Sequence, residues 1–268
     1  MAENNQLLDL NYIASRLEAL EETIIMRLID RAQFKVNDIV YEAGKSGFKG
    51  ETSRCLFDLR MHFHEQMDAA FGRFIVPEER PFTRNLPKPQ RKVSIPDTGL
   101  KIDNFENVNF AGPIRLNYMK LIKEICAPGD DGQYGSSVEH DVYAIQAISR
   151  RIHFGAFYVT ECKFKNDPHT FLPHIFNRDI EALKKLITRE EVEERIVNRV
   201  FQKTVEVQRS ANREVRTIIE PEVIDAFYRN TVIPLTKEGE IAYLLHRTLS
   251  DIGEITETED EQPITLNN

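Results

Sequence analysis

The sequence predicts an all-α protein. Apolar residues recur every three or four positions over much of its 268 residues, no segment shows the alternating pattern of a strand, and 41% of the residues are hydrophobic. The first two observations favour amphipathic helices. The third is enough for a substantial buried core. We therefore expect one large helical-bundle domain over residues 1–250.

Two long amphipathic helices are predicted in the first third of the chain, over residues 7–34 and 51–74. Five prolines then fall within residues 77–98, so an extended loop is expected there. The apolar face of the first helix carries Leu7, Leu10, Ile13, Leu17, Leu20, Ile24 and Leu28, and that of the second carries Leu56, Leu59, Phe63, Met67, Ala70, Phe71 and Phe74.

Helical patterns resume after this loop. A shorter helix is predicted over residues 113–125, where Pro113 suits the first turn, and apolar spacing returns between Val138 and Ile152. Further helices are expected at 178–187, 189–209, 221–230 and 234–249. Residues 251–268 contain six acidic and no basic residues, which predicts a disordered tail.

The composition narrows the classes of function. A formal net charge of −8 without a concentrated basic face argues against a nucleic-acid partner, and an anionic substrate would need local positive charge. No apolar run reaches the roughly 18 residues of a membrane helix. The three cysteines are far apart and outside any CxxC pattern, which favours a reduced, cytoplasmic setting. His62 and His64 have the spacing of one strand face, so in a helix they are interpreted as ordinary residues rather than metal ligands.

One segment is unusual for a helix. Residues 146–155 read Gln-Ala-Ile-Ser-Arg-Arg-Ile-His-Phe-Gly and set two adjacent arginines in an apolar frame. This segment resembles the central signature of the yeast- and plant-type chorismate mutases, in which the second arginine binds substrate. Further matches lie, in the same order as in the family, at Ile24–Phe34, Arg80–Phe82, Val192–Ile196 and Val232–Glu238. By this resemblance the chain is identified as a member of that family over residues 7–249.

The resemblance implies an all-helical homodimer that converts chorismate to prephenate without a cofactor, a metal ion or a covalent intermediate. Chorismate is a dianion, so cationic side chains should hold its carboxylates. Negative charge grows on the ether oxygen during this Claisen-type rearrangement, and hydrogen-bond donors stabilise it there. A lysine and a protonated glutamate would provide those donors.

The family pattern assigns a role to each candidate residue. By the resemblance, the catalytic residues are Arg151, Lys163 and Glu240, and the substrate-binding residues are Arg189, Glu193 and Thr236. Thr236 and Glu240 lie four positions apart, on one helix face. Without the resemblance, the same arginine and carboxylates would be interpreted as ordinary surface residues.

The sequence departs from the family pattern in its first helix. Ala14 stands where the family has a second site arginine, and Arg16 lies about 200° further around the helix. Arg189 replaces a family asparagine one turn before Glu193 and would restore the missing cation. Alternatively, Arg189 and Glu193 form an ordinary ion pair four residues apart.

A second departure concerns spacing. The family separates its signature arginine from its lysine by eleven positions, whereas Arg151 and Lys163 are twelve apart. A regular helix would turn Lys163 about 120° away from the Arg151 face and present Cys162 instead. A π-bulge near Phe157 and Tyr158 would absorb the extra residue and return the lysine to the site. We expect the bulge.

The resemblance also locates an effector site for aromatic amino acids. Gly135 and Ser136 match its loop, and Arg73 keeps one of its two arginines. The other arginine is replaced by Gly72, and Glu139 and Glu220 fall where the yeast pattern has threonines. We therefore expect regulation by tryptophan and tyrosine to be weak or absent.

Three hypotheses follow from these matches and departures. The first is a cytosolic chorismate mutase. The second is a family member whose remodelled pocket catalyses another rearrangement in specialised metabolism. The third is a non-catalytic binding or regulatory homologue, which would be favoured if Cys162 replaced Lys163 in the pocket.

Overall fold

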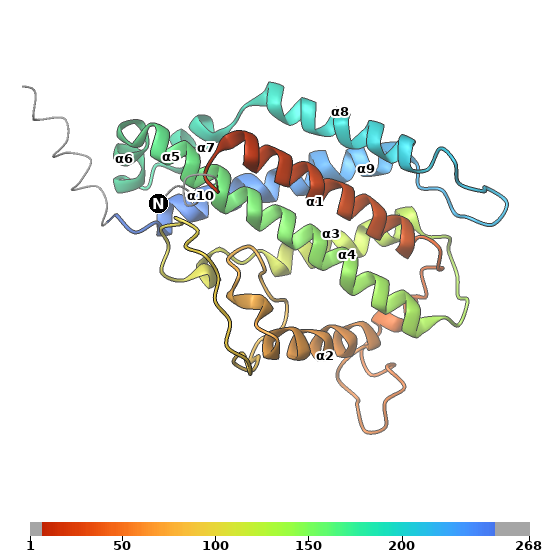
Figure 1. Ribbon diagram of the computed structural model, residues 1–268. Helices are drawn as coiled ribbons and strands as arrows, with labels where there is room; N and C mark the ends of the chain where they lie inside the picture. The colour runs from red at the N-terminus through yellow and green to blue at the C-terminus, as the bar shows by residue number, and fades with distance from the viewer. Residues whose placement is uncertain (1–6, 250–268) are drawn as a thin grey trace, which may run out of the picture.

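The chain forms a bundle of α-helices (Figure 1) in the computed structural model, which describes residues 7–249. Helix α1 (Leu10–Arg31) packs along α4 (Tyr134–Phe154), whose helical path continues to Asn166. Between residues 7 and 249, β pairing is limited to one bridge between Ile102 and Arg247. No helix in that range combines the length and apolarity needed to cross a membrane. The predicted all-α fold is confirmed.

Most helices have nearly the predicted bounds. α3 (Ala111–Ile125), α7 (Ile180–Ile187) and α8 (Glu190–Val207) match closely, whereas α2 (Leu56–Ala70) begins five residues later than predicted. Short 3₁₀ turns occur at Asp38–Tyr41, Arg73–Ile75 and Phe105–Val108, and the proline-rich segment 77–98 contains no helix, as expected. The acidic tail predicted over 251–268 lies outside the described residues.

Helix α6 (Pro168–Phe176) was not predicted. Its start nevertheless has a local cause in the sequence. The Asp167 side chain accepts a hydrogen bond from the backbone N–H of Thr170, and Pro168 occupies the first helical position. Both are established helix-start signals, so the missing prediction reflects the shortness of the apolar pattern rather than a lack of signal.

The largest apolar core fixes α1 against α4. Ile24 and Leu28 of α1 are fully buried in the same cluster as Ile145 and Ile148 of α4. Burying a side chain of this size contributes about 1.5–3 kcal/mol. Because the two helices run antiparallel (Figure 1), this core places the start of α1 beside the end of α4.

The helical segment after α4 contains the predicted π-bulge. A π-turn at Gly155–Val159 connects α4 to α5 (Thr160–Asn166) without a break. Phe157 and Tyr158 are buried in a second apolar cluster with Ile13 of α1. The bulge is confirmed at the position where the sequence required an extra residue to be absorbed.

A second π-turn was not predicted. α9 (Pro221–Phe227) runs through a π-turn at Tyr228–Val232 into α10 (Ile233–His246), where two separate helices were expected. Pro234 is the second residue after this π-turn, and a proline has no N–H to donate to the preceding turn. A new helix was predicted to begin at residue 234, whereas the wider turn lets one helix continue past the proline.

Candidate active site

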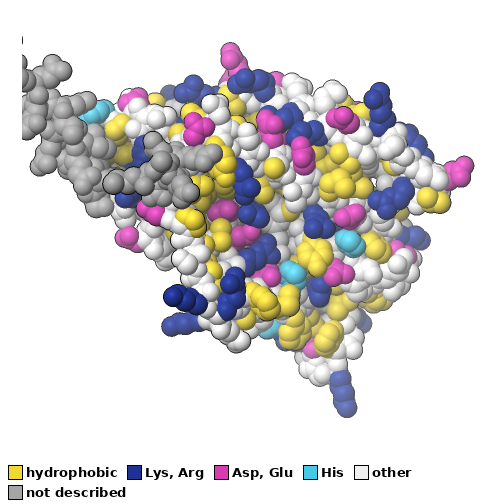
Figure 2. Space-filling view, viewed as in Figure 1, with side chains coloured by type: hydrophobic (Ala, Val, Ile, Leu, Met, Phe, Trp, Pro, Cys, Tyr) yellow, Lys and Arg dark blue, Asp and Glu magenta, His cyan; other side chains and the backbone are white. Residues whose placement is uncertain are grey.

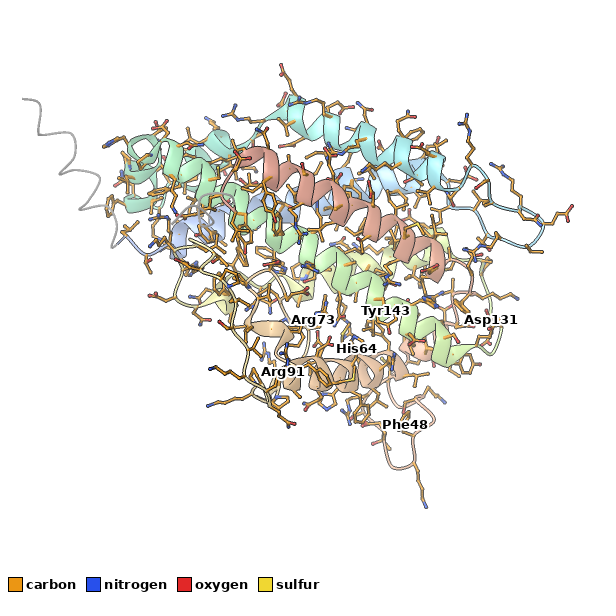
Figure 3. The ribbon with its side chains drawn as sticks, viewed as in Figure 1. Phe48, His64, Arg73, Arg91, Asp131 and Tyr143 are labelled. Atoms are coloured by element: carbon orange, nitrogen blue, oxygen red, sulfur yellow. The ribbon has the colours of Figure 1, made fainter. Side chains whose placement is uncertain are left out.

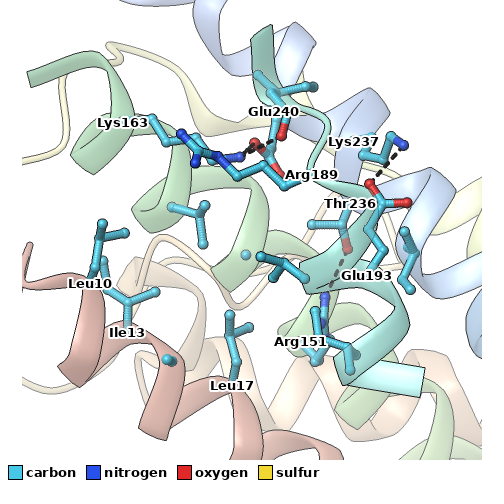
Figure 4. Close-up of a pocket in the computed structure, with 17 residues that line it drawn as sticks. Leu10, Ile13, Leu17, Arg151, Lys163, Arg189, Glu193, Thr236, Lys237 and Glu240 are labelled. Atoms are coloured by element: carbon cyan, nitrogen blue, oxygen red, sulfur yellow. Dashed lines mark hydrogen bonds and ion pairs between the residues drawn. The ribbon is translucent and has the colours of Figure 1, made fainter. Parts of the chain in front are cut away.

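A cavity of about 390 Å³ lies between the start of α1, the π-bulge at 155–159, the start of α8, and α10 (Figure 4). Its apolar lining includes Leu10, Ile13, Leu17, Val159 and Ile233, and its polar lining includes Arg151, Lys163, Arg189, Glu193, Thr236, Lys237 and Glu240. The structure therefore brings together in one cavity all six residues predicted for catalysis and substrate binding.

Arg151 lies at the base of this cavity and is almost fully buried, with 2% of its surface exposed. Its Nη1 donates to Thr236 Oγ1 at 3.0 Å, and its Nη2 lies 3.4 Å from Glu21 Oε1. Among the described residues, its Nε has no hydrogen-bond partner. Nε and Nη2 form one edge of the guanidinium, and the long contact to Glu21 is the one that this edge makes among the described residues.

Glu21 was not identified from the sequence, although it holds Arg151. It is fully buried on α1 and also accepts two hydrogen bonds from Arg199 of α8, at 2.9 and 3.1 Å. A signal was available, since Glu21 lies one turn after Leu17 and one turn before Ile24 on the apolar stripe of that helix. A carboxylate on a buried stripe needs a cationic partner.

Lys163 and Glu240 face each other across the upper part of the cavity (Figure 4). Lys163 Nζ lies 2.8 Å from Glu240 Oε2 and also donates to the backbone oxygen of Ile187 at 2.9 Å. Burial raises the pKa of Glu240. Lys163 and Arg151 oppose this rise, and Glu193 adds to it. We conclude that burial dominates, because only 5% of Glu240 is exposed.

The π-bulge decides which side chain enters the cavity. Lys163 lines it, whereas the thiol of Cys162 donates to the backbone oxygen of Leu8 at 3.0 Å and lies outside the lining. The alternative of an unbroken helix with Cys162 in the pocket is therefore wrong. The site therefore keeps the lysine donor that an unbroken helix would have removed.

Two glycines allow α10 to approach the bulge. A Cβ on Gly155 would lie 2.9 Å from Thr236 Cγ2, and one on Gly239 would lie 2.7 Å from the Cβ of Ala156. Real Cβ atoms do not approach so closely, so any larger residue would push the helices apart. This contact holds Thr236 and Glu240 opposite Arg151 and Lys163.

The remaining charges lie at the start of α8. Arg189 is the exposed N-terminal flanking residue of α8 and has an extended backbone, with φ of −137°. It lines the cavity without an ion pair to any described residue. Glu193 instead pairs with Lys237 of α10, with Nζ 2.9 Å from Oε1. The alternative pair of Arg189 with Glu193 does not form.

The two residues of the first helix that depart from the family pattern, Ala14 and Arg16, lie where the sequence predicted. Ala14 lines the cavity where the family pattern places an arginine, and Arg16 is absent from the lining described for this cavity. Lys237 was missed by the sequence analysis, because its pairing with Glu193 joins positions 44 apart and leaves no local pattern.

The three residues expected at an effector site are not brought together within one chain. Arg73 pairs with Asp68 at 2.6 Å and with Glu79 at 2.8 Å, and it also donates to Gln146 in the middle of α4. Gly135 and Ser136 lie in the first turn of α4, next to the loop of Asp131 and far along the helix from Arg73 (Figure 3). Glu139, which stands where the yeast pattern has a threonine, pairs with Arg60 at 2.9 Å.

The charges of this cavity indicate what it can bind. Among the described lining residues, four cations (Arg151, Lys163, Arg189 and Lys237) face two carboxylates (Glu193 and Glu240) over an apolar floor. This local excess of positive charge opposes the chain's net charge of −8 and suits a small dianion. Fold and site therefore define an all-helical protein with a pocket suited to a small anion.

Comparison with known proteins identifies the family. No protein-family model matches the chain. The chorismate mutase of Schizosaccharomyces pombe is 35% identical over 91% of this chain and 98% of its own length, and chorismate mutase 2 of Petunia hybrida is 35% identical over 90% and 93%. A crystal structure of a Candida albicans chorismate mutase in complex with L-Trp superposes with a TM-score of 0.85 at 29% identity, covering 94% of this chain and 97% of that one. The chain belongs to the chorismate mutase family of yeast and plants.

Proposed function

We propose that this protein is a chorismate mutase, an isomerase that rearranges chorismate to prephenate in the cavity described above. The observation that carries the proposal is the meeting of Arg151, Lys163 and Glu240 around one cavity with an excess of cations. These are the three residues to which the family resemblance assigns catalysis.

The chemistry needs little covalent participation by the protein. The carbon–oxygen bond of the ether breaks while a carbon–carbon bond forms within the same molecule, so the site contributes by holding the reactive conformer and stabilising charge. Lys163 Nζ and Glu240 Oε2 lie only 2.8 Å apart. The ether oxygen of the substrate can therefore accept hydrogen bonds from both the lysine ammonium and the protonated glutamate. Glu240 donates only when it is protonated, and its raised pKa favours that state.

Binding of the dianion uses the remaining charges. Arg151 presents the edge of its guanidinium to one carboxylate, and Arg189, which has no ion pair among the described residues, reaches the other in place of the arginine lost at Ala14. Glu193 accepts from the substrate hydroxyl. Thr236 acts through Arg151, because its hydroxyl already donates to the backbone oxygen of Val232 at 2.7 Å and accepts from Arg151.

An assay of prephenate formation by the purified protein tests this function. Turnover of chorismate that saturates with substrate is expected. A folded protein without turnover would contradict the proposal and favour either another rearrangement or a non-catalytic homologue. A structure with a bound transition-state analogue separates those two, because an enzyme places the analogue's ether oxygen against Lys163 and Glu240.

We also propose that the protein is a homodimer through the outer face of α2. Phe63, Met67 and Phe71 follow one another at intervals of four on that face, and each is more than half exposed. Figure 2 shows hydrophobic side chains gathered in this region of the surface. Replacing Met67 with lysine is expected to lower the mass measured by light scattering from dimer to monomer, and a wild-type monomer at micromolar concentration would exclude the dimer.

A cytosolic location is proposed on chemical grounds. Cys55, Cys126 and Cys162 are all free thiols in the described structure, which suits a reducing compartment. Relatives named as chloroplastic also match this chain, among them chorismate mutase 1 of Zea mays at 33% identity. Imaging of a fluorescent fusion tests the proposal, and accumulation in an organelle would contradict it.

A further inference from the structure

Lys237 occupies the mouth of the cavity. It follows Thr236 on α10, has 21% of its side chain exposed, and lines both the active-site cavity and an adjoining hollow formed with Lys184, Lys185 and Thr188. Its Nζ donates to Glu193 Oε1 at 2.9 Å, which joins α10 to the start of α8 (Figure 4). One carboxylate oxygen of Glu193 is thereby held by protein and the other stays available.

Apolar packing does little to fix Glu193 at the start of α8, where the neighbouring Glu194 accepts two hydrogen bonds from Arg229 at 2.6 and 2.8 Å. The first buried side chain of this helix is Val197, one turn after Glu193, and Val192 is 38% exposed. Core packing therefore positions the middle and end of α8 but not its first turn. A side chain that must meet a substrate within a few tenths of an ångström needs a partner there.

Lys237 also determines which cation of the cavity pairs with Glu193. Arg189 and Glu193 line the same cavity with opposite charges, so without Lys237 the carboxylate of Glu193 would attract Arg189. That pair would withdraw both side chains from the substrate. With Lys237 in place, Glu193 is neutralised from α10 and Arg189 keeps no ion pair among the described residues.

We propose that Lys237 is a positioning residue, which holds Glu193 in its substrate-binding orientation and keeps Arg189 free to bind a substrate carboxylate. The inference rests on the proposed chorismate mutase activity. It predicts that loss of Lys237 weakens substrate binding more than it slows the bound substrate, because both affected side chains bind parts of the substrate remote from the breaking bond.

The chain offers a matched control. Lys203 of α8 bridges to Glu22 of α1 at 2.5 Å, has 20% of its side chain exposed, and lies outside the cavity lining. Like Lys237, it joins two helices through an ion pair whose lysine is about one-fifth exposed, although Glu22 is more exposed than Glu193 (58% against 28% of the side chain). Exposed pairs of this kind contribute little to stability, so neither substitution is expected to unfold the protein.

The experiment compares KM and kcat of the full chain carrying Lys237→Met, Lys237→Arg or Lys203→Met. Lys237→Met is expected to raise KM about tenfold with kcat reduced less than about threefold, corresponding to the loss of one charge-assisted contact. Lys237→Arg should restore most of the loss, and Lys203→Met should match the wild type. Equal KM for Lys237→Met and wild type, or an equal rise for Lys203→Met, would overturn the inference.

A double-variant comparison tests whether Lys237 acts through Glu193. If it does, the double variant Lys237→Met, Glu193→Gln should have the same KM as Glu193→Gln alone. If the two residues act independently, their separate increases in KM should multiply. Multiplied losses would refute the positioning role while leaving the proposed function intact. A wild-type protein without chorismate turnover would remove the proposed function and, with it, this inference.

Discussion

Truncating Arg151 to alanine should abolish most of the activity while the protein stays folded. We expect Nε and Nη2 of the guanidinium to bind a substrate carboxylate, and each charge-assisted hydrogen bond contributes about 1.5–3 kcal/mol. Losing both raises the barrier by about 3–6 kcal/mol, which lowers kcat/KM by about 10²–10⁴-fold. Glu21 keeps its two hydrogen bonds from Arg199, so the buried carboxylate is not left without a cation.

The neighbouring arginine supplies the control for this measurement. Arg150 points away from the cavity toward Glu78 and Glu79, at 3.6 and 3.2 Å, with 35% of its side chain exposed. Arg150→Ala should keep kcat/KM within about threefold of the wild type, and Arg151→Lys, which keeps the charge but not the planar fork, should remain strongly impaired. Steady-state kinetics with circular dichroism of each variant provides the assay. An Arg151→Ala protein with a native spectrum and kcat/KM within tenfold of the wild type would refute the reasoning.

Three further predictions concern pH, packing and regulation. Because burial raises the pKa of Glu240 and the protonated acid is the donor, activity should fall as pH rises through that pKa, whereas Glu240→Gln should keep its activity at high pH. Identical pH profiles would exclude this role. Gly239→Ala should lower the free energy of unfolding in urea by about 1–3 kcal/mol through the clash with Ala156, whereas Gly112→Ala, which meets nothing within 4 Å, should not. Tryptophan or tyrosine should change turnover little, since an effector carboxylate would have to displace both Asp68 and Glu79 from Arg73. A several-fold response to sub-millimolar effector would contradict this.

The sequence predicted those parts of the fold that depend on local periodicity. The stripe of Ile13, Ile24 and Leu28 predicted α1, and a count of positions between Arg151 and Lys163 predicted the first π-bulge. The second bulge was missed because Pro234 is a strong local signal for a helix start. Only the packing of α10 against the π-bulge and α4 shows that the helix continues through it.

The site was predictable where one motif carried several residues and unpredictable where partners come from distant segments. The carboxylate and threonine of α10 belong to one motif, and the structure places both in the cavity. The partner of Glu193 could be guessed from sequence only as Arg189, four positions away, whereas the structure pairs it with Lys237, 44 positions away. The four-residue rule applies within a helix, whereas residue 189 is extended rather than helical.

The π-bulge at Gly155–Val159 also determines how the chain tolerates a change of length. Every residue after it is turned about 100° relative to a regular helix, so deleting one residue from this turn would leave a regular helix in which Lys163 still lies on the Arg151 face. The same turn explains how a one-residue insertion can persist in a helix that borders the chemistry. An alignment drawn without a gap here would assign the lysine's role to Cys162, so comparisons of related sequences through this segment need the gap placed inside the turn.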